Sequence, residues 1–261
     1  MKKRSKKRIR YGILILLSVY LAACFSLRFS VRETALDALE ENGCMLYYIV
    51  NTDGMKGLGH SVVMIVDEAG CGTVFSYNGM QRSLTESLLG KSGVGKLSMG
   101  TMTADETEAF LQSGNLLLDG DQLADNYDVA LYRPITAEDY RVVLEQTRPY
   151  LAAQEQFASL YERWAVEENA GRKVRYRQEL EQMGQGDMLP VYQIYMNNCD
   201  HVARLLASSV DSELQDYTDH TRRMTPNGNA KAFGVRAESW GVMMLGEQSL
   251  LERFLMFLMI F

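Results

Sequence analysis

Residues 195–206 of the chain read YMNNCDHVARLL and predict a cysteine at the start of a helix. An asparagine pair precedes Cys199, and an apolar helical face formed by Val202, Leu205 and Leu206 follows it. Unpaired backbone N–H groups and the helix dipole stabilise a thiolate at such a position, and only the thiolate attacks carbonyl carbons well. The sequence therefore indicates that Cys199 is a nucleophile.

The base expected beside this thiol is a histidine far upstream. The chain has three histidines, and one of them, His60, opens the apolar run HSVVMIV at residues 60–66. A turn at residues 67–72 and a β-rich run at 73–78 follow, so we predict a hairpin with His60 at its open end. A strand end holds an imidazole rigidly while one edge of the ring stays open, which suits a general base.

The residue that orients this histidine should come from the strand paired with it. Ser76 and Asn78 lie on one side of that strand, and Asn78 falls nearly opposite His60 if the turn centres on residues 69–70. Asparagine is a known orienting residue in Cys–His–Asn arrangements. We assign the role to Asn78, with Ser76 as the alternative, and expect the Cys199 backbone N–H to form part of an oxyanion hole.

The other two histidines receive no catalytic role. His201 is two positions from Cys199 on the predicted helix and therefore points to a different face. His220 lies in a polar stretch that we expect at the surface. A metal site would need Cys199 and Asp200 to converge from adjacent helix positions, so we expect no metal, and we expect no cofactor.

Together these residues resemble the circularly permuted papain-like superfamily, which includes NlpC-type cell-wall amidases and lecithin:retinol acyltransferase-like proteins. In permuted members the histidine strand precedes the cysteine helix, and the matching regions here are residues 45–80 and 190–210. The NCDHV box at 198–202 is similar to the NCEHF box of the acyltransferase-like branch. That branch has a histidine on the second hairpin strand, where this chain offers Ser76 or Asn78. The box also differs at Asp200 and Val202.

The resemblance implies an α+β fold in which a small antiparallel sheet packs on a cysteine-bearing helix, with Cys199 as nucleophile and His60 as base. The expected function is an enzyme, a cysteine hydrolase that cleaves an amide bond, with cell-wall peptide as one candidate substrate. Two alternatives stay open. One is a noncatalytic envelope binding module on the same scaffold, and the other is a thiol acyltransferase that acts on lipid. Expected partners are a peptide or acyl substrate of the cell envelope, and no oligomeric state is predicted.

Residues 1–29 are expected to target or anchor the chain. Seven Lys and Arg residues fall within the first ten positions, and residues 11–27 are apolar apart from Ser18 and Ser26. Residues 21–24 read LAAC and resemble a bacterial lipobox, in which Cys24 would be lipidated, while an uncleaved signal anchor is the alternative. Both place the domain, residues 30–261, outside the cytoplasm and at the cell membrane. Without the seven basic residues the net charge of −6 becomes −13, which argues against nucleic acid as a partner.

The rest of the chain is predicted only as approximate helices, strands and loops. We predict a helix at 104–112, a strand at 127–133, and a loop with a short helix at 81–100. A helical insertion over about 136–188 should begin at Thr136, break near Ala153 and resume through Leu180. It is either a solvent-exposed insertion or a lid over the substrate or partner site. The apolar segment 249–261 is either a core element or a membrane-surface contact. Whether Cys44 and Cys71 form a disulfide stays open.

Overall fold

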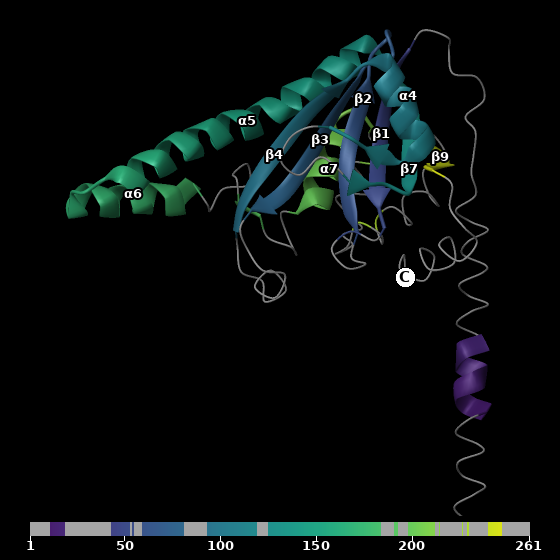
Figure 1. Cartoon of the computed structure of the whole chain (residues 1–261), viewed down its shortest axis with the longest axis horizontal. Coiled ribbons are helices and arrows are strands. Elements are labelled where there is room, and N and C mark those ends of the chain that lie inside the picture. The colour runs from purple at the N-terminus through teal and green to yellow at the C-terminus, as the bar shows by residue number, and fades with distance from the viewer. Residues whose placement is uncertain are drawn as a thin grey trace, which may run out of the picture.

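The chain was analysed as a computed structural model, which describes residues 11–18, 43–52, 54, 59–80, 93–118, 125–183, 191–192, 198–211, 214, 226, 229 and 240–246. Its centre is a seven-stranded antiparallel sheet with the strand order β8-β4-β3-β2-β1-β7-β9 (Figure 1). The strands of this sheet are β1 (Cys44–Asn51), β2 (His60–Val66), β3 (Gly72–Met80), β4 (Gly93–Met102), β7 (Val129–Ile135), β8 (Val191–Tyr192) and β9 (Gly241–Met244). A separate two-stranded pair consists of β5 (Asn115–Leu116) and β6 (Asp125–Asn126).

Strands β1 and β2 lie in the middle of the sheet, and every residue of both is buried. Both faces of these strands are covered, which explains why their sequences are continuous apolar runs rather than alternating ones. The predicted hairpin of β2 and β3 is confirmed. At its turn the Asp67 carboxylate accepts hydrogen bonds from the backbone N–H groups of Ala69 and Cys71, both at 2.9 Å. Gly70 has a φ of 83°, which a residue without a Cβ adopts readily.

Helices cover both faces of the sheet. Helix α7 (Cys199–Ser208) and helix α5 (Ala137–Val166) lie on one face, and helix α4 (Ala104–Ser113) lies on the other. The first core joins Val63 and Phe75 of the sheet to Val202 and Leu206 of α7. The second core joins Met64 and Val74 to Phe110 of α4. The structure therefore has the expected α+β class and a cysteine-bearing helix packed on an antiparallel sheet, although the sheet is larger than expected.

Two helix starts follow the sequence signals closely. Thr103 caps α4 and Thr136 caps α5, each in a capping box with the acidic residue three positions later, Glu106 and Asp139. These caps satisfy backbone N–H groups that have no partner within the helix. The predicted helix at 104–112 and the predicted helix start at Thr136 are both confirmed.

The expected break near Ala153 is wrong. Helix α5 continues through Pro149 and Ala153 to Val166, and the chain turns at residues 167–169 into α6 (Ala170–Met183). The residues around Ala153 are mostly strong helix formers, so nothing local interrupts the helix there. At the turn, the carboxylate of Glu167 accepts a hydrogen bond from the backbone N–H of Asn169 at 2.9 Å.

The expected loop at 81–100 is also wrong where the structure describes it, because residues 93–100 belong to β4. One of the glycines that suggested a loop, Gly95, serves close packing instead. A Cβ at Gly95 would collide with the Tyr77 hydroxyl of β3, so a glycine is needed beneath that ring. The strand expected at 127–133 exists with shifted bounds, as β7, and β8 and β9 had no clear signal in the sequence.

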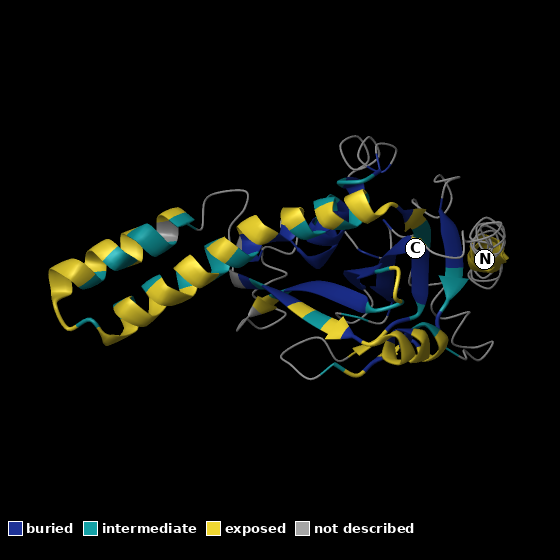
Figure 2. Cartoon of the chain, turned by 90° about the horizontal axis from the view of Figure 1, so that it is seen from above, coloured by how far each residue is buried: buried dark blue, intermediate teal, exposed yellow. Residues whose placement is uncertain are grey.

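The outer half of α5 and all of α6 project from the sheet as a helical arm, residues 151–183 (Figure 2). No residue of this arm whose exposure is described is buried. One tie to the body is Gln154, whose side chain bonds the backbone N–H and carbonyl of Leu97 at 2.7 and 3.2 Å. The arm comprises residues 151–183 of the helical insertion predicted over about 136–188. The first half of α5 packs on the sheet, and residues 184–188 lie outside the described residues.

Near the N-terminus the structure describes a helix at residues 11–18, whose side chains are exposed. Within the described part of the chain, no helix has the length and apolar character needed to cross a membrane. The rest of the expected anchor, the Cys24 lipobox, His220 and the apolar segment 249–261 lie outside the described residues.

Candidate functional site

Cys199 is the first residue of α7, as the sequence predicts. Asn198 caps the helix, and its side-chain oxygen accepts a hydrogen bond from the backbone N–H of His201 at 2.9 Å. The thiol is buried, with Cys199 2% exposed. The unpaired N–H groups and dipole of the first turn therefore act on a sulfur atom that water barely reaches.

The protein controls the charge of this thiol through several contacts. Burial raises the pKa of Cys199 to about 11, and the neighbouring Asp200 carboxylate also raises it. Backbone hydrogen bonds at Ser61 and Asp200 and the Tyr192 hydroxyl act in the opposite direction and partly offset the burial. The thiol is therefore neutral at pH 7 in this state, with donors already in place for a negative charge.

Tyr192 reaches the thiol because its ring lies over a glycine of β3. A Cβ at Gly79 would lie 2.6 Å from Cδ1 of Tyr192, so any larger residue would displace the ring. The ring centroids of Tyr192 and Tyr77 are 5.9 Å apart. Burial and the Cys199 sulfur, to which the phenol donates, raise the pKa of Tyr192, so the hydroxyl remains a donor. No local pattern in the sequence marks Tyr192 as part of the site.

His60 lies at the start of β2, with Nε2 3.1 Å from the Ser76 hydroxyl of β3. The Asn78 amide donates a hydrogen bond to the same hydroxyl at 2.8 Å. Continuing the Val62–Ser76 register by two residues places Asn78 across from His60, as the sequence analysis expected. The two predicted orienting residues thus form one chain, in which Ser76 contacts the imidazole and Asn78 lies behind Ser76.

The imidazole is uncharged at neutral pH. Burial lowers the pKa of His60 to about 4, and the carboxylate of Asp125 opposes this shift. Asp125 is held close by Asn51, which pairs with His60 across β1 and β2 and donates to Asp125 at 2.8 Å. The Tyr127 ring lies 6.4 Å from the imidazole, centroid to centroid. A neutral imidazole has a free nitrogen lone pair, which a general base requires.

The side chains of the two principal residues lie on opposite faces of the sheet and are not bonded to each other. His60 shares a strand face with Val62, on the α4 side of the sheet, whereas Cys199 belongs to α7 on the other side. Within the described structure no hydrogen bond joins them. They approach at Ser61, which follows His60 in the chain and bonds the Cys199 sulfur through its backbone. The pairing of β2 with β3 ends at Val62 and Ser76, so the strands separate at this point.

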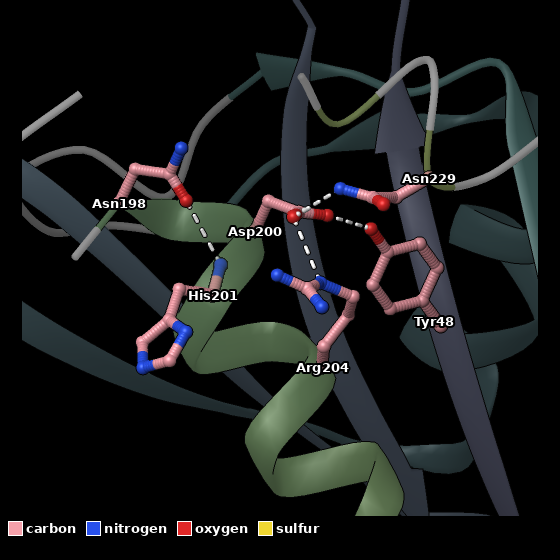
Figure 3. A network of polar contacts seen from close by, with 6 residues as sticks. All are labelled: Tyr48, Asn198, Asp200, His201, Arg204 and Asn229. Carbon is pink, nitrogen blue, oxygen red and sulfur yellow. Dashed lines mark hydrogen bonds and ion pairs between the residues drawn. The ribbon is translucent and has the colours of Figure 1, made fainter. Parts of the chain in front are cut away.

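Beside the thiol lies a buried polar network that the sequence analysis did not identify (Figure 3). The Asp200 carboxylate accepts hydrogen bonds from the Tyr48 hydroxyl, from Arg204 Nε at 2.9 Å and from Asn229 Nδ2 at 2.6 Å. The available signal was an acid in the first helical turn with an arginine four positions later. His201 points away from this network in Figure 3, in agreement with its predicted different face.

Among the described residues, no three His, Cys, Asp or Glu side chains gather as a metal site. Cys44 and Cys71 are both free thiols. The sequence matches no protein-family model, and no curated protein or solved structure shows significant similarity to it. The functional interpretation therefore rests on the geometry of Cys199, His60 and their neighbours.

Proposed function

We propose that this chain is a cysteine hydrolase that cleaves an amide bond, with Cys199 as nucleophile and His60 as base. The observation that carries the proposal is that the thiol bonds the backbone of Ser61, the residue next to His60, although the two side chains lie on opposite faces of the sheet. A thiol at a helix N-terminus contacts Ser61, and the adjacent residue in the chain is a histidine held by Ser76 and Asn78. The same order of histidine hairpin and cysteine helix supports a permuted papain-like arrangement.

The proposed reaction begins when the thiol proton passes to His60 and the sulfur attacks the amide carbon. The new C–S bond forms as the carbonyl oxygen becomes an oxyanion, for which the Cys199 backbone N–H and the Tyr192 hydroxyl are the candidate donors. His60 then gives its proton to the leaving nitrogen, the C–N bond breaks and a thioester remains. Water, deprotonated by the same imidazole, hydrolyses the thioester and restores the thiol.

Activation must accompany substrate binding in this proposal. With a thiol pKa of about 11 and an imidazole pKa of about 4, proton transfer from Cys199 to His60 is strongly unfavourable in the state described. Movement of the imidazole toward the sulfur would stabilise both charges as an ion pair and shift both pKa values in the favourable direction. The β2–β3 pairing ends at Val62, so within the described structure His60 is held in the sheet at this end of β2 by its pairing with Asn51 of β1 alone.

The experiment is hydrolysis of purified cell-wall peptides, followed by mass spectrometry of the products. Cys199→Ala should abolish cleavage, and His60→Ala should reduce it severely. The matched control is Cys71→Ala, which removes a half-buried free thiol from the β2–β3 turn and should retain activity. Retained cleavage by Cys199→Ala would refute the nucleophile assignment. Acyl-lipid substrates tested in parallel would reveal the alternative acyltransferase.

One observation favours a second candidate, a noncatalytic envelope binding module on the same scaffold. Cys199 is buried and has no hydrogen bond to His60. The test compares peptide binding by the wild type and by Cys199→Ala. If both bind cell-wall peptide with the same affinity and the wild type leaves the peptide intact, this candidate replaces the hydrolase.

We also propose that the domain is held at the cell membrane and faces outward. The basic start of the chain followed by the apolar run to residue 27 supports this orientation. A reporter enzyme that is active only outside the cytoplasm, fused after residue 42, should be active. Mass measurement of the mature chain separates lipidation at Cys24 from an uncleaved anchor.

A further inference from the structure

A buried ion pair lies one residue from the candidate nucleophile. Arg204 Nε is 2.9 Å from the Asp200 carboxylate one helical turn away, and the two side chains are only 5% and 1% exposed. Buried ion pairs contribute little net stability, because removing both charges from water costs about as much as their attraction returns. Stability therefore does not account well for a pair in this place.

The Asp200 carboxylate ties the first turn of α7 to two other parts of the fold. Its three donors come from Tyr48 on β1, Arg204 on α7 and Asn229 in a segment far along the chain (Figure 3). These bonds hold the backbone on which Cys199 is mounted. A displacement of the first turn would move the sulfur away from Ser61 and Tyr192.

The same carboxylate has an electrostatic effect on the sulfur. A negative charge next to the thiol opposes thiolate formation, and a buried site screens that charge poorly. The Arg204 guanidinium supplies the compensating positive charge. Besides Asp200 and Arg204, the titratable groups that interact with the thiol or with this pair come from three further elements or segments: they are Tyr48, Tyr127 and Tyr192.

We propose that Arg204 is a positioning residue for Cys199, which acts by neutralising and orienting the Asp200 carboxylate beside the nucleophile. This inference rests on the proposed role of Cys199. It assigns to the ion pair a function in the ionisation of the thiol, in addition to packing of the helix.

The test is alkylation of the intact, full-length protein with iodoacetamide, an uncharged reagent. The rate at Cys199 is followed by mass spectrometry of the peptide that contains it, over a range of pH. Below the midpoint of the thiol titration the rate follows the thiolate fraction, which changes about tenfold for each unit of pKa. Turnover is not required, so the measurement is independent of any substrate.

We expect Asp200→Asn to speed alkylation about tenfold, because a repelling charge is removed while the side-chain shape is kept. Arg204→Met should slow it about tenfold, because the carboxylate is left without its compensating charge. Arg204→Lys should restore a rate near that of the wild type. Arg148→Met, which removes the partner of Glu145 from an exposed pair on α5, is the matched control and should change nothing.

A packing role alone predicts a different pattern, because loosening the helix exposes the sulfur and speeds alkylation in every variant. Faster labelling of Arg204→Met, or no change in either single variant, would therefore overturn the proposal. If Arg204→Met does not fold, the double variant Asp200→Asn/Arg204→Met decides the question. A rate near that of the wild type supports the proposal, because both charges are removed together, and a clearly faster or slower rate contradicts it. Cleavage by Cys199→Ala would refute the hydrolase and leave these rates unaffected.

Discussion

The imidazole Nε2 of His60 lies 3.1 Å from the hydroxyl oxygen of Ser76 on the adjacent strand. The Ser76 hydroxyl in turn accepts a hydrogen bond from Asn78, so the serine is fixed between the ring and an amide. Ser76 and Asn78, which the sequence offered as alternative orienting residues, are therefore consecutive members of one hydrogen-bonded chain that ends at His60. This arrangement leads to the first prediction.

Ser76→Ala should lower kcat about fivefold, because the imidazole loses the hydrogen bond that sets its orientation, worth about 1 kcal/mol. Hydrolysis rates at saturating substrate test this. Ser208→Ala is a suitable control, because it removes another buried serine whose hydroxyl bonds the Leu205 carbonyl at 3.1 Å, away from His60. Equal rates for Ser76→Ala and Ser208→Ala would show that Ser76 does not orient the base.

The burial of His60 predicts a loss of stability in acid. Its pKa falls from 6.5 to about 4 on folding, so the unfolded chain binds the proton more readily. Stability should therefore decrease as the pH is lowered from about 6.5 to about 4, by about 3 kcal/mol from this group alone. Urea unfolding of the wild type and of His60→Gln over this range measures the difference. An identical pH dependence in both proteins would contradict the buried, neutral imidazole.

Tyr192→Phe should raise the pKa of Cys199 further, because the hydroxyl that donates to the sulfur is lost while the ring remains. The pH at which Cys199 alkylates half-maximally should move upward, and cleavage should slow. Tyr161→Phe changes an exposed tyrosine on the helical arm and should leave both quantities unchanged. A downward movement of the midpoint would mean that Tyr192 protects the thiol sterically and does not stabilise its charge.

Asp211 should contribute strongly to stability beyond the end of α7. Its carboxylate pairs with Arg133 of β7 and accepts a hydrogen bond from the Trp240 indole at 2.6 Å. Burial opposes ionisation, but these partners and the Leu214 backbone keep the pKa of Asp211 below its ordinary value. Asp211→Ala should lower the free energy of unfolding by about 3 kcal/mol at neutral pH.

Because the pKa of Asp211 is depressed in the folded state, its contribution is present above the ordinary value of 3.8 and disappears as the pH falls through the folded value. The difference between wild type and Asp211→Ala should accordingly shrink in acid. Glu138→Ala removes an acid from a largely exposed pair with Arg141 and should cost less than about 0.5 kcal/mol. Equal losses for the two variants would contradict the role of burial.

The helical arm should be removable. Replacing residues 158–180 with a short Gly/Ser linker deletes no residue described as buried, so the melting temperature should stay within a few degrees of the wild type. Helical circular dichroism should fall with the lost residues. A large drop in melting temperature would show that the arm supports the core. Retained folding with lost cleavage would support a role in substrate binding.

Much of the local structure was predictable from the chain. The caps at Thr103 and Thr136, the β2–β3 hairpin and the start of α7 at Cys199 depend on residues within about four positions of each other. Strand β4 was not predictable in this way, because its Gly95 leaves room for the Tyr77 ring of another strand. The uninterrupted course of α5 was also missed, although the intrinsic helix propensity of its residues favours it.

The sequence by itself determined which residues are the candidate nucleophile, base and orienting residues. Residue types are read from it directly, and the pairing of the two hairpin strands follows from the position of the turn between them. The partners of these groups depend on packing. Tyr192 contacts the sulfur because Gly79 leaves room for its ring, and the Asp200 carboxylate next to the thiol is held by Tyr48 and Asn229 from distant parts of the chain. The charge states follow from the same packing, since exclusion of water from Cys199 and His60 moves their pKa values in opposite directions.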